Sequence, residues 1–158
     1  VNISSPNTPQ LRDLHSDDNI RELLDAIKNE SQKLGTFKPI FLKISPDESN
    51  ETIENISNLI ELSSLSGLIV SNTTLDKSSL NKSKKNFEGG LSGAPLMEKS
   101  TEMIKKISTK HPSMPIIGVG GVLKKDDFLK KIEFGASLVQ IYSGFIIKGP
   151  KIVNEILQ

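Results

Sequence analysis

Two glycine-rich turns stand directly after apolar runs in the second half of the sequence. The run 114–117 (MPII) leads into 118–121 (GVGG), and the run 138–142 (LVQIY) leads into Ser143 and Gly144. Glycines let a backbone approach a ligand closely and turn its N–H groups toward an anion, and a following helix N-terminus adds to the attraction. Either turn alone could be an ordinary tight turn. The pair, after two successive strands, favours a phosphate site of the kind built at the end of (β/α)8 barrels.

Other polar side chains collect where each predicted strand ends, which is the edge at which parallel sheets hold their chemistry. They are Asn2, Ser5, Asn7 and Thr8 after the first strand, Ser71, Asn72 and Thr73 after the third, Ser92 and Gly93 in the long loop that follows, and Tyr142 and Ser143 after the last. An amide side chain both donates and accepts hydrogen bonds, so several Asn residues at one edge suit a ligand with alternating C=O and N–H groups, such as a pyrimidine. A single Asn in a loop is usually a turn former.

Lys43 is the strongest single candidate for a functional residue, because it interrupts the apolar run 41–44 (FLKI). A buried ammonium is costly unless an anion or a hydrogen-bonding group meets it. One interpretation is an edge-strand lysine that points to water. The other is a positive charge that faces a phosphate or an electron-rich cofactor ring.

These residues need a scaffold of parallel strands, and the sequence predicts five strands alternating with five helices. The strands fall at 1–3, 40–44, 67–70, 114–117 and 138–142, and three of them are almost wholly apolar, as in a parallel sheet covered by helices. Helical spacing of apolar residues follows the capping groups 16–18 and Ser49, and recurs over 99–110 and 124–134. Gly149 and Pro150 begin the last helix. The fold class is therefore α/β, but alternation alone leaves open whether the sheet is open or part of a barrel.

Composition excludes several classes of function. The sequence has 158 residues and no Cys, which excludes disulfides, thiolate metal sites and a cysteine nucleophile. His15 and His111 lie far apart in the sequence, so no histidine metal site is expected. A net charge of +1 gives no reason to expect a nucleic acid partner. No apolar run approaches the roughly 20 residues of a membrane-spanning helix.

Six blocks of the sequence, taken in order, resemble dihydroorotate dehydrogenase of the quinone-dependent class (class 2). They are 1–8 (VNISSPNT), 41–47 (FLKISPD), 67–74 (GLIVSNTT), 89–93 (GGLSG), 115–121 (PIIGVGG) and 135–142 (GASLVQIY). The resemblance implies that residues 1–158 form one partial FMN-binding domain. This domain would be the C-terminal part of a (β/α)8 TIM barrel, from about strand four to helix eight.

In that family FMN accepts a hydride from C6 of dihydroorotate while a base removes the C5 proton, and the orotate formed serves pyrimidine (UMP) biosynthesis. The resemblance places the catalytic base at Ser5, where class 1 enzymes have Cys. A serine is a weak base and needs a relay for its proton; Thr8 is a candidate helper. The residues implied to hold the substrate are Asn2, Asn7, Asn72 and Thr73.

The same resemblance implies a set of flavin contacts. They are Asn2, Lys43, Ser71, Ser92, Gly93, Gly120, Gly121, Tyr142 and Ser143. Lys43 matches the lysine beside the flavin pyrimidine edge, where its charge stabilises the reduced ring. Gly120, Gly121, Tyr142 and Ser143 match the phosphate grip, in agreement with the two glycine-rich turns. Ser71 and Ser143 stand where relatives often have Thr, and both keep the hydroxyl.

The resemblance also implies parts that these residues do not contain. Barrel strands one to three would add further flavin and substrate contacts, and an N-terminal helical region would form the quinone tunnel and associate with a bacterial or mitochondrial inner membrane. We therefore expect the full-length protein to be a peripheral membrane protein. We expect the 158-residue chain by itself to be soluble and inactive, and to hold FMN weakly or not at all.

Three other interpretations remain at this stage. Another FMN barrel, such as class 1 dihydroorotate dehydrogenase or the dihydropyrimidine dehydrogenase domain, is disfavoured by Ser5 in place of Cys. A half-barrel binding or assembly module without catalysis would tolerate loss of the Ser5 hydroxyl. A plain α/β domain would leave the polar loops as mere surface.

Overall fold

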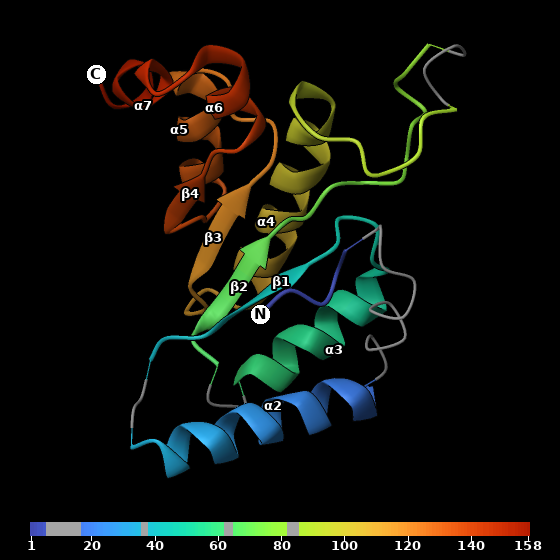
Figure 1. Ribbon diagram of the computed structural model, residues 1–158, viewed down its shortest axis with the longest axis vertical. Coiled ribbons are helices and arrows are strands. Elements are labelled where there is room, and N and C mark those ends of the chain that lie inside the picture. The colour runs from blue at the N-terminus through green and yellow to red at the C-terminus, as the bar shows by residue number, and fades with distance from the viewer. Residues whose placement is uncertain (6–16, 36–37, 62–64, 82–85) are drawn as a thin grey trace.

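The computed structural model describes residues 1–5, 17–35, 38–61, 65–81 and 86–158 (Figure 1). Strands and helices alternate along the chain, which confirms the α/β prediction. The elements are α2 (Asp17–Lys33), β1 (Phe41–Ile44), α3 (Asn50–Glu61), β2 (Gly67–Val70), the 3-10 helix η3 (Ala94–Leu96), α4 (Met97–Lys110), β3 (Ile116–Val119), α5 (Lys125–Glu133), β4 (Leu138–Gln140), α6 (Ser143–Lys148) and α7 (Lys151–Leu157).

The four strands form one parallel sheet in the order β1-β2-β3-β4, so that each strand pairs with its successor in the chain. Each crossover between parallel strands is expected to be right-handed, which places every connecting helix on the same face of the sheet. In Figure 1 the helices follow the strands in the same sequence, with α3 near β1, α4 beside β2 and β3, and α5 beside β4. A doubly wound sheet would reverse its strand order part-way. This uninterrupted order is that of consecutive strands in a (β/α)8 barrel.

The N-terminal segment lies beside β1 but is not a full strand. Asn2 forms an isolated parallel bridge with Lys43, and the Lys43 amide donates to the Val1 carbonyl at 2.8 Å. The Ser4 amide instead donates to Asn2 Oδ1 at 3.2 Å. A local side chain to backbone bond of this kind competes with a strand ladder. The prediction of a first strand over 1–3 is therefore wrong in extent, although the segment still ends at the same edge of the sheet.

The core lies between the sheet and its helices. Alternate strand residues face the helices and are almost completely buried: Leu42, Ile44, Leu68, Val70 and Ile116, against Ile20, Leu24, Ile56, Ile60, Ile104 and Ile107. Because successive strand side chains point to opposite faces, Lys43 and Ile117 belong to the other face. In a closed barrel that face is the interior.

The predicted helix starts are mostly correct. The Ser49 hydroxyl accepts a hydrogen bond from the Thr52 amide at 3.0 Å, which confirms Ser49 as the cap of α3. The predicted cap Ser16 lies outside the described residues.

The prediction that Gly149 and Pro150 begin the last helix is confirmed, because α7 starts at Lys151 with Pro150 as its N-cap. The helix α6 before it was not predicted, and Gly149 at φ +73° separates the two. In α6 the three consecutive apolar residues Phe145, Ile146 and Ile147 are all exposed. Their run has no helical periodicity, so the sequence pattern could not indicate this helix. Among the described residues no helix is both long and apolar enough to cross a membrane.

Candidate functional site

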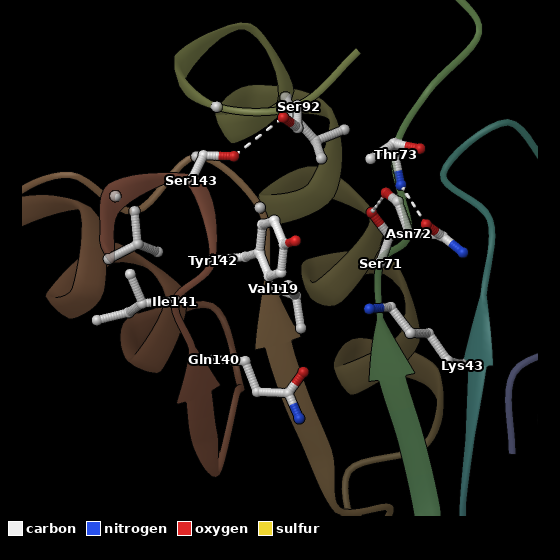
Figure 2. Close-up of a pocket in the computed structure, with 16 residues that line it drawn as sticks. Lys43, Ser71, Asn72, Thr73, Ser92, Val119, Gln140, Ile141, Tyr142 and Ser143 are labelled. Atoms are coloured by element: carbon white, nitrogen blue, oxygen red, sulfur yellow. Dashed lines mark hydrogen bonds between the residues drawn. The ribbon is translucent and has the colours of Figure 1, made fainter. Parts of the chain in front are cut away.

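A cavity of about 430 Å³ lies at the carboxyl ends of the strands (Figure 2). Its volume is within the range of small-molecule and cofactor sites. The predicted residues that line it are Lys43, Ser71, Asn72, Thr73, Ser92, Gly93, Gly120, Gly121, Tyr142 and Ser143. Segments from β1 through α6, far apart in the chain, therefore meet around one space. Within the described residues no cluster of His, Asp and Glu suited to a metal ion is present.

The loop after β3 forms the floor of one part of the cavity. Gly120 and Gly121 have φ of +114° and +79°, a conformation that side chains disfavour. The start of α4 packs directly on this loop, and a Cβ atom on Gly121 would lie 2.5 Å from Met97 Cβ and 2.7 Å from the Met97 nitrogen. Both conformation and space therefore require glycine here. Backbone rather than side chains faces this part of the cavity.

Two serines join the opposite walls of the same region. Ser143 Oγ, at the start of α6, lies 2.9 Å from Ser92 Oγ, in the long loop after β2. Figure 2 shows this pair beside the Tyr142 ring, which projects into the space between Ser143 and the Asn72–Thr73 side. Tyr142 is 77% exposed. Hydroxyls and an uncovered aromatic ring thus surround the glycine loop.

Lys43 is the positive charge of the cavity. It extends from β1 toward the cavity in Figure 2, and burial lowers the pKa of its ammonium. In the described part of the chain no carboxylate forms an ion pair with it. β1 is the terminal strand of the four-stranded sheet and meets the N-terminal segment through a single bridge at Asn2. The Lys43 side chain is nevertheless half-buried and lines the cavity. An uncompensated charge that faces a cavity favours an anionic or electron-rich ligand.

Amide side chains tie the N-terminal segment to the end of β2. Asn72 Nδ2 donates to the Ser4 carbonyl at 3.1 Å and lies 3.2 Å from Asn2 Oδ1, while Asn72 Oδ1 accepts from the Thr73 amide at 2.8 Å. Asn2 therefore joins the predicted group through Asn72 rather than by lining the cavity. Ser5 is partly buried and follows this network directly. Asn7 and Thr8 lie outside the described residues.

Sequence reasoning missed Ser4 and Gln140. Ser4 is buried, and its hydroxyl lies 2.9 Å from the Lys43 carbonyl, so it connects the two predicted groups. Gln140 is the last residue of β4 and lines the cavity. A polar residue in the run 138–142, two positions from Leu138 and thus on the same face, was the available signal for Gln140.

The sequence did not indicate the role of Asp47, whose carboxylate binds two loops and a helix together and is called the Asp47 clamp below. Asp47, after β1, accepts hydrogen bonds from Lys99 Nζ at 2.6 Å, from the Leu75 amide at 2.7 Å and from the Thr74 hydroxyl. Burial alone would raise the pKa of Asp47, but the bonds from Lys99, Thr74 and Leu75 hold it below its ordinary value. This one side chain joins the loop after β1, the loop after β2 and the first turn of α4.

Comparison with known proteins places the chain in a family. The family model described as dihydroorotate dehydrogenase matches residues 1–158. The chain belongs to the dihydroorotate dehydrogenase family. It is 43% identical over 159 residues to a dihydroorotate dehydrogenase (quinone) of Christiangramia forsetii, covering 100% of this chain and 47% of that protein. It is 49% identical over 164 residues to the protein of the same name from Bartonella tribocorum, covering 100% of this chain and 46% of that one.

Solved structures agree with the sequence relatives. The ligand-free DHODH of Eimeria tenella superposes with a TM-score of 0.89 at 34% identity, over 98% of this chain and 48% of that one. The DHODH of the same organism in complex with ferulenol also gives a TM-score of 0.89, at 33% identity. The chain spans about half the length of the curated relatives it matches. These findings confirm the predicted resemblance to the quinone-dependent class and the predicted C-terminal part of a barrel.

The glycine loop after β3 allows a direct test by substitution. We expect Gly121→Ala in the full-length protein to abolish tight binding of a phosphate-bearing cofactor, because the new methyl group meets the backbone of Met97. The matched control is Gly149→Ala, at φ +73° with nothing within 4 Å. It carries similar strain, about 1–2 kcal/mol, without the clash. Fluorescence titration with FMN measures both variants, and equal affinities would contradict the prediction.

The second prediction concerns the Asp47 clamp. We expect Asp47→Asn to lower the free energy of unfolding by roughly 1–3 kcal/mol at pH 7. Because the folded pKa of Asp47 is depressed, its contribution is present above the unfolded pKa of about 3.9 and is lost as pH falls through the lower folded pKa. The difference between wild type and variant should therefore shrink in acid, as measured by urea unfolding at several pH values.

Asp126→Asn is the control for the clamp. The Asp126 side chain is 79% exposed, and its one ion pair in the described part of the chain is with Lys124, also largely exposed, at 3.3 Å. Exposed pairs contribute little, so this variant should unfold like wild type. A loss as large as that of Asp47→Asn would show that the clamp has no special role.

Proposed function

We propose that the full-length protein is a quinone-dependent dihydroorotate dehydrogenase that oxidises dihydroorotate to orotate in de novo pyrimidine (UMP) biosynthesis. The observation that carries the proposal is the meeting of Lys43, Asn72 and Gly121 around one cavity at the carboxyl ends of the strands. The names of the relatives from Christiangramia forsetii and Bartonella tribocorum support it.

The cavity fits FMN as the cofactor. Its volume is about 430 Å³, one wall is a glycine loop on which a side chain would collide with α4, and another carries the Lys43 ammonium. The phosphate would be held by Gly120, Gly121, Tyr142 and Ser143. Ser71, Ser92 and Gly93 would contact the remainder of the cofactor. A preformed cradle of this kind suits an anionic group, because backbone N–H groups can point at it without a competing side chain.

The reaction removes a hydride from C6 and a proton from C5 of dihydroorotate, leaving the C5–C6 double bond of orotate. Bound FMN supplies the two-electron acceptor, and the electrons pass finally to a quinone. Ser5 is proposed to take the C5 proton, with its hydroxyl proton passing to a neighbouring acceptor. Asn2, Asn7, Asn72 and Thr73 are proposed to hold the pyrimidine and its carboxylate, and Lys43 presents its charge to the flavin ring.

The quinone site and membrane attachment are proposed to lie outside these 158 residues. In this proposal the full-length protein is peripheral to a bacterial or mitochondrial inner membrane, where its quinone is dissolved. An N-terminal helical region would provide both the attachment and the quinone tunnel.

The third prediction tests Ser5 as the base. In the full-length protein Ser5→Ala should lower kcat for dihydroorotate by about 10²–10⁴-fold, the usual contribution of general base catalysis. The FMN content should stay at the wild-type level, because Ser5 is not among the residues that line the cavity. Steady-state quinone reduction and flavin absorbance measure the two quantities.

The control for Ser5 is Ser137→Ala, an exposed serine at the amino end of β4, on the opposite edge of the sheet. It should keep wild-type turnover. Turnover by Ser5→Ala equal to that of Ser137→Ala would rule out Ser5 as the base, and absence of turnover in the wild-type protein would favour the non-catalytic binding module.

The fourth prediction tests the charge beside the flavin. Lys43→Met in the full-length protein should make the midpoint potential of bound FMN more negative, because a positive charge near the ring favours the electron-rich reduced form. Lys38→Met is the matched control, since Lys38 is exposed near the amino end of the same strand. Spectroelectrochemical titration gives both potentials. Identical potentials in the two variants would remove Lys43 from the flavin site.

A further inference from the structure

Lys131 is a buried lysine that the proposed reaction does not use. It lies on α5 with 0% exposure, and its Nζ donates to Ser100 Oγ at 2.7 Å and to Thr101 Oγ1 at 3.1 Å, both on α4. In the part of the chain that the structure describes, no ion pair of Lys131 is found. Burial lowers the pKa of Lys131 to about 8, while Asp127 acts to raise it and Lys130 to lower it further. The group is therefore still mainly an ammonium at neutral pH.

The sheet makes room for this side chain. A Cβ atom on Gly118 of β3 would lie 3.2 Å from Lys131 Cδ and 3.0 Å from Ile104 Cδ1. Gly118 does not have a positive φ. Space rather than backbone conformation therefore favours glycine at this position. The first glycine of 118–121 accommodates the lysine stem, and the next two form the cavity floor.

Ser100 carries the effect of Lys131 to the cavity floor. Its hydroxyl lies 3.3 Å from the Gly120 carbonyl oxygen and 3.1 Å from the Met97 carbonyl oxygen. An ammonium can only donate, so Ser100 accepts from Lys131 and keeps its own hydrogen for a carbonyl. That single hydrogen is within reach of both carbonyl oxygens, so the Gly120 carbonyl lies turned toward α4, into the protein.

The direction of that carbonyl decides what the loop offers to a ligand. The Gly120 C=O and the Gly121 N–H belong to one planar trans peptide and point in opposite directions. With the carbonyl turned toward α4, the Gly121 N–H points away from α4, and Gly121 lines the cavity. Both glycines have positive φ, so the peptide between them has little intrinsic resistance to rotation. A rotated peptide would present an oxygen to an anion.

We propose that Lys131 is a positioning residue of the phosphate site, which acts through Ser100 to hold the Gly120–Gly121 peptide with its N–H toward the bound phosphate. This inference rests on the proposed function, because it takes the ligand at this loop to be the phosphate of FMN. Lys131 itself touches neither cofactor nor substrate.

Two single substitutions separate this role from a merely structural one. Ser100→Ala and Thr101→Val each remove one hydroxyl that accepts from Lys131, and both sites are buried. Only the Ser100 hydroxyl also reaches the glycine loop; that of Thr101 lies 3.8 Å from Met97 Sδ. The two variants should therefore lose similar stability but differ at the phosphate site.

The experiment measures Kd for FMN and for riboflavin, which lacks the phosphate, in the full-length protein. We expect Ser100→Ala to weaken FMN about tenfold, the loss of roughly one hydrogen bond, and to leave riboflavin unchanged. Thr101→Val should keep the wild-type ratio of the two affinities. Lys131→Met should reduce the preference for FMN over riboflavin. Its melting temperature should not fall, because the substitution also removes a buried charge.

The outcomes are distinguishable. Unchanged ratios in both Ser100→Ala and Lys131→Met overturn the inference and leave the proposed function standing. An equal fall of the ratio in Thr101→Val would assign the effect to general loosening of α4 and would also overturn it. A wild-type protein that binds FMN no more tightly than riboflavin would overturn the phosphate assignment on which both proposals rest.

Discussion

The close approach of α4 to the end of β3 is the contact on which the rest of the site depends. Leu96, Met97 and Ser100 lie so near Gly120 and Gly121 that no side chain fits between them. This contact keeps the cavity floor as bare backbone, and it brings the first turn of α4 to the same rim as the loops after β1 and β2. The approach is possible because α4 also buries Ile104 and Ile107 against the sheet. Apolar packing thus brings the helix to a distance at which its first turn can shape a polar site.

Charge is distributed unevenly around the cavity, and the distribution suits an anionic, electron-rich ligand. Lys43 faces the space without an ion-pair partner in the described part of the chain, while the carboxylate of Asp47 is engaged with Lys99 and Thr74 behind the rim. Hydroxyl and amide groups supply the remaining polarity. A carboxylate within the cavity would neutralise the lysine and oppose a phosphate. Because Asp47 lies outside the cavity, its negative charge stabilises the surrounding loops instead.

The two faces of the sheet differ in how far their side chains are exposed. Leu42 and Leu68 face the helices with 0% exposure, whereas Leu138, on the other face, is 63% exposed. The chain covers 48% of the ligand-free Eimeria tenella structure, with a TM-score of 0.89. In a (β/α)8 barrel the face opposite the helices is the packed interior, so Leu138 lies on the face that corresponds to a barrel interior.

The sequence by itself determined the α/β class, the sheet-end polar residues and the glycine pair, because strand and helix patterns and turn glycines express local constraints within a few residues. Its resemblance to class 2 dihydroorotate dehydrogenase, which the family match confirms, suggested roles for individual residues, and those roles stay predictions. Only the tertiary structure decided the barrel order of the strands, the single bridge in place of a first strand, and the presence of α6 before the predicted last helix. It also decided which distant groups meet: Lys131 bonds to a serine 31 positions away, and Asn72 to Asn2 across 70 positions. Such contacts follow from the packing of whole elements, and no spacing within the chain encodes them.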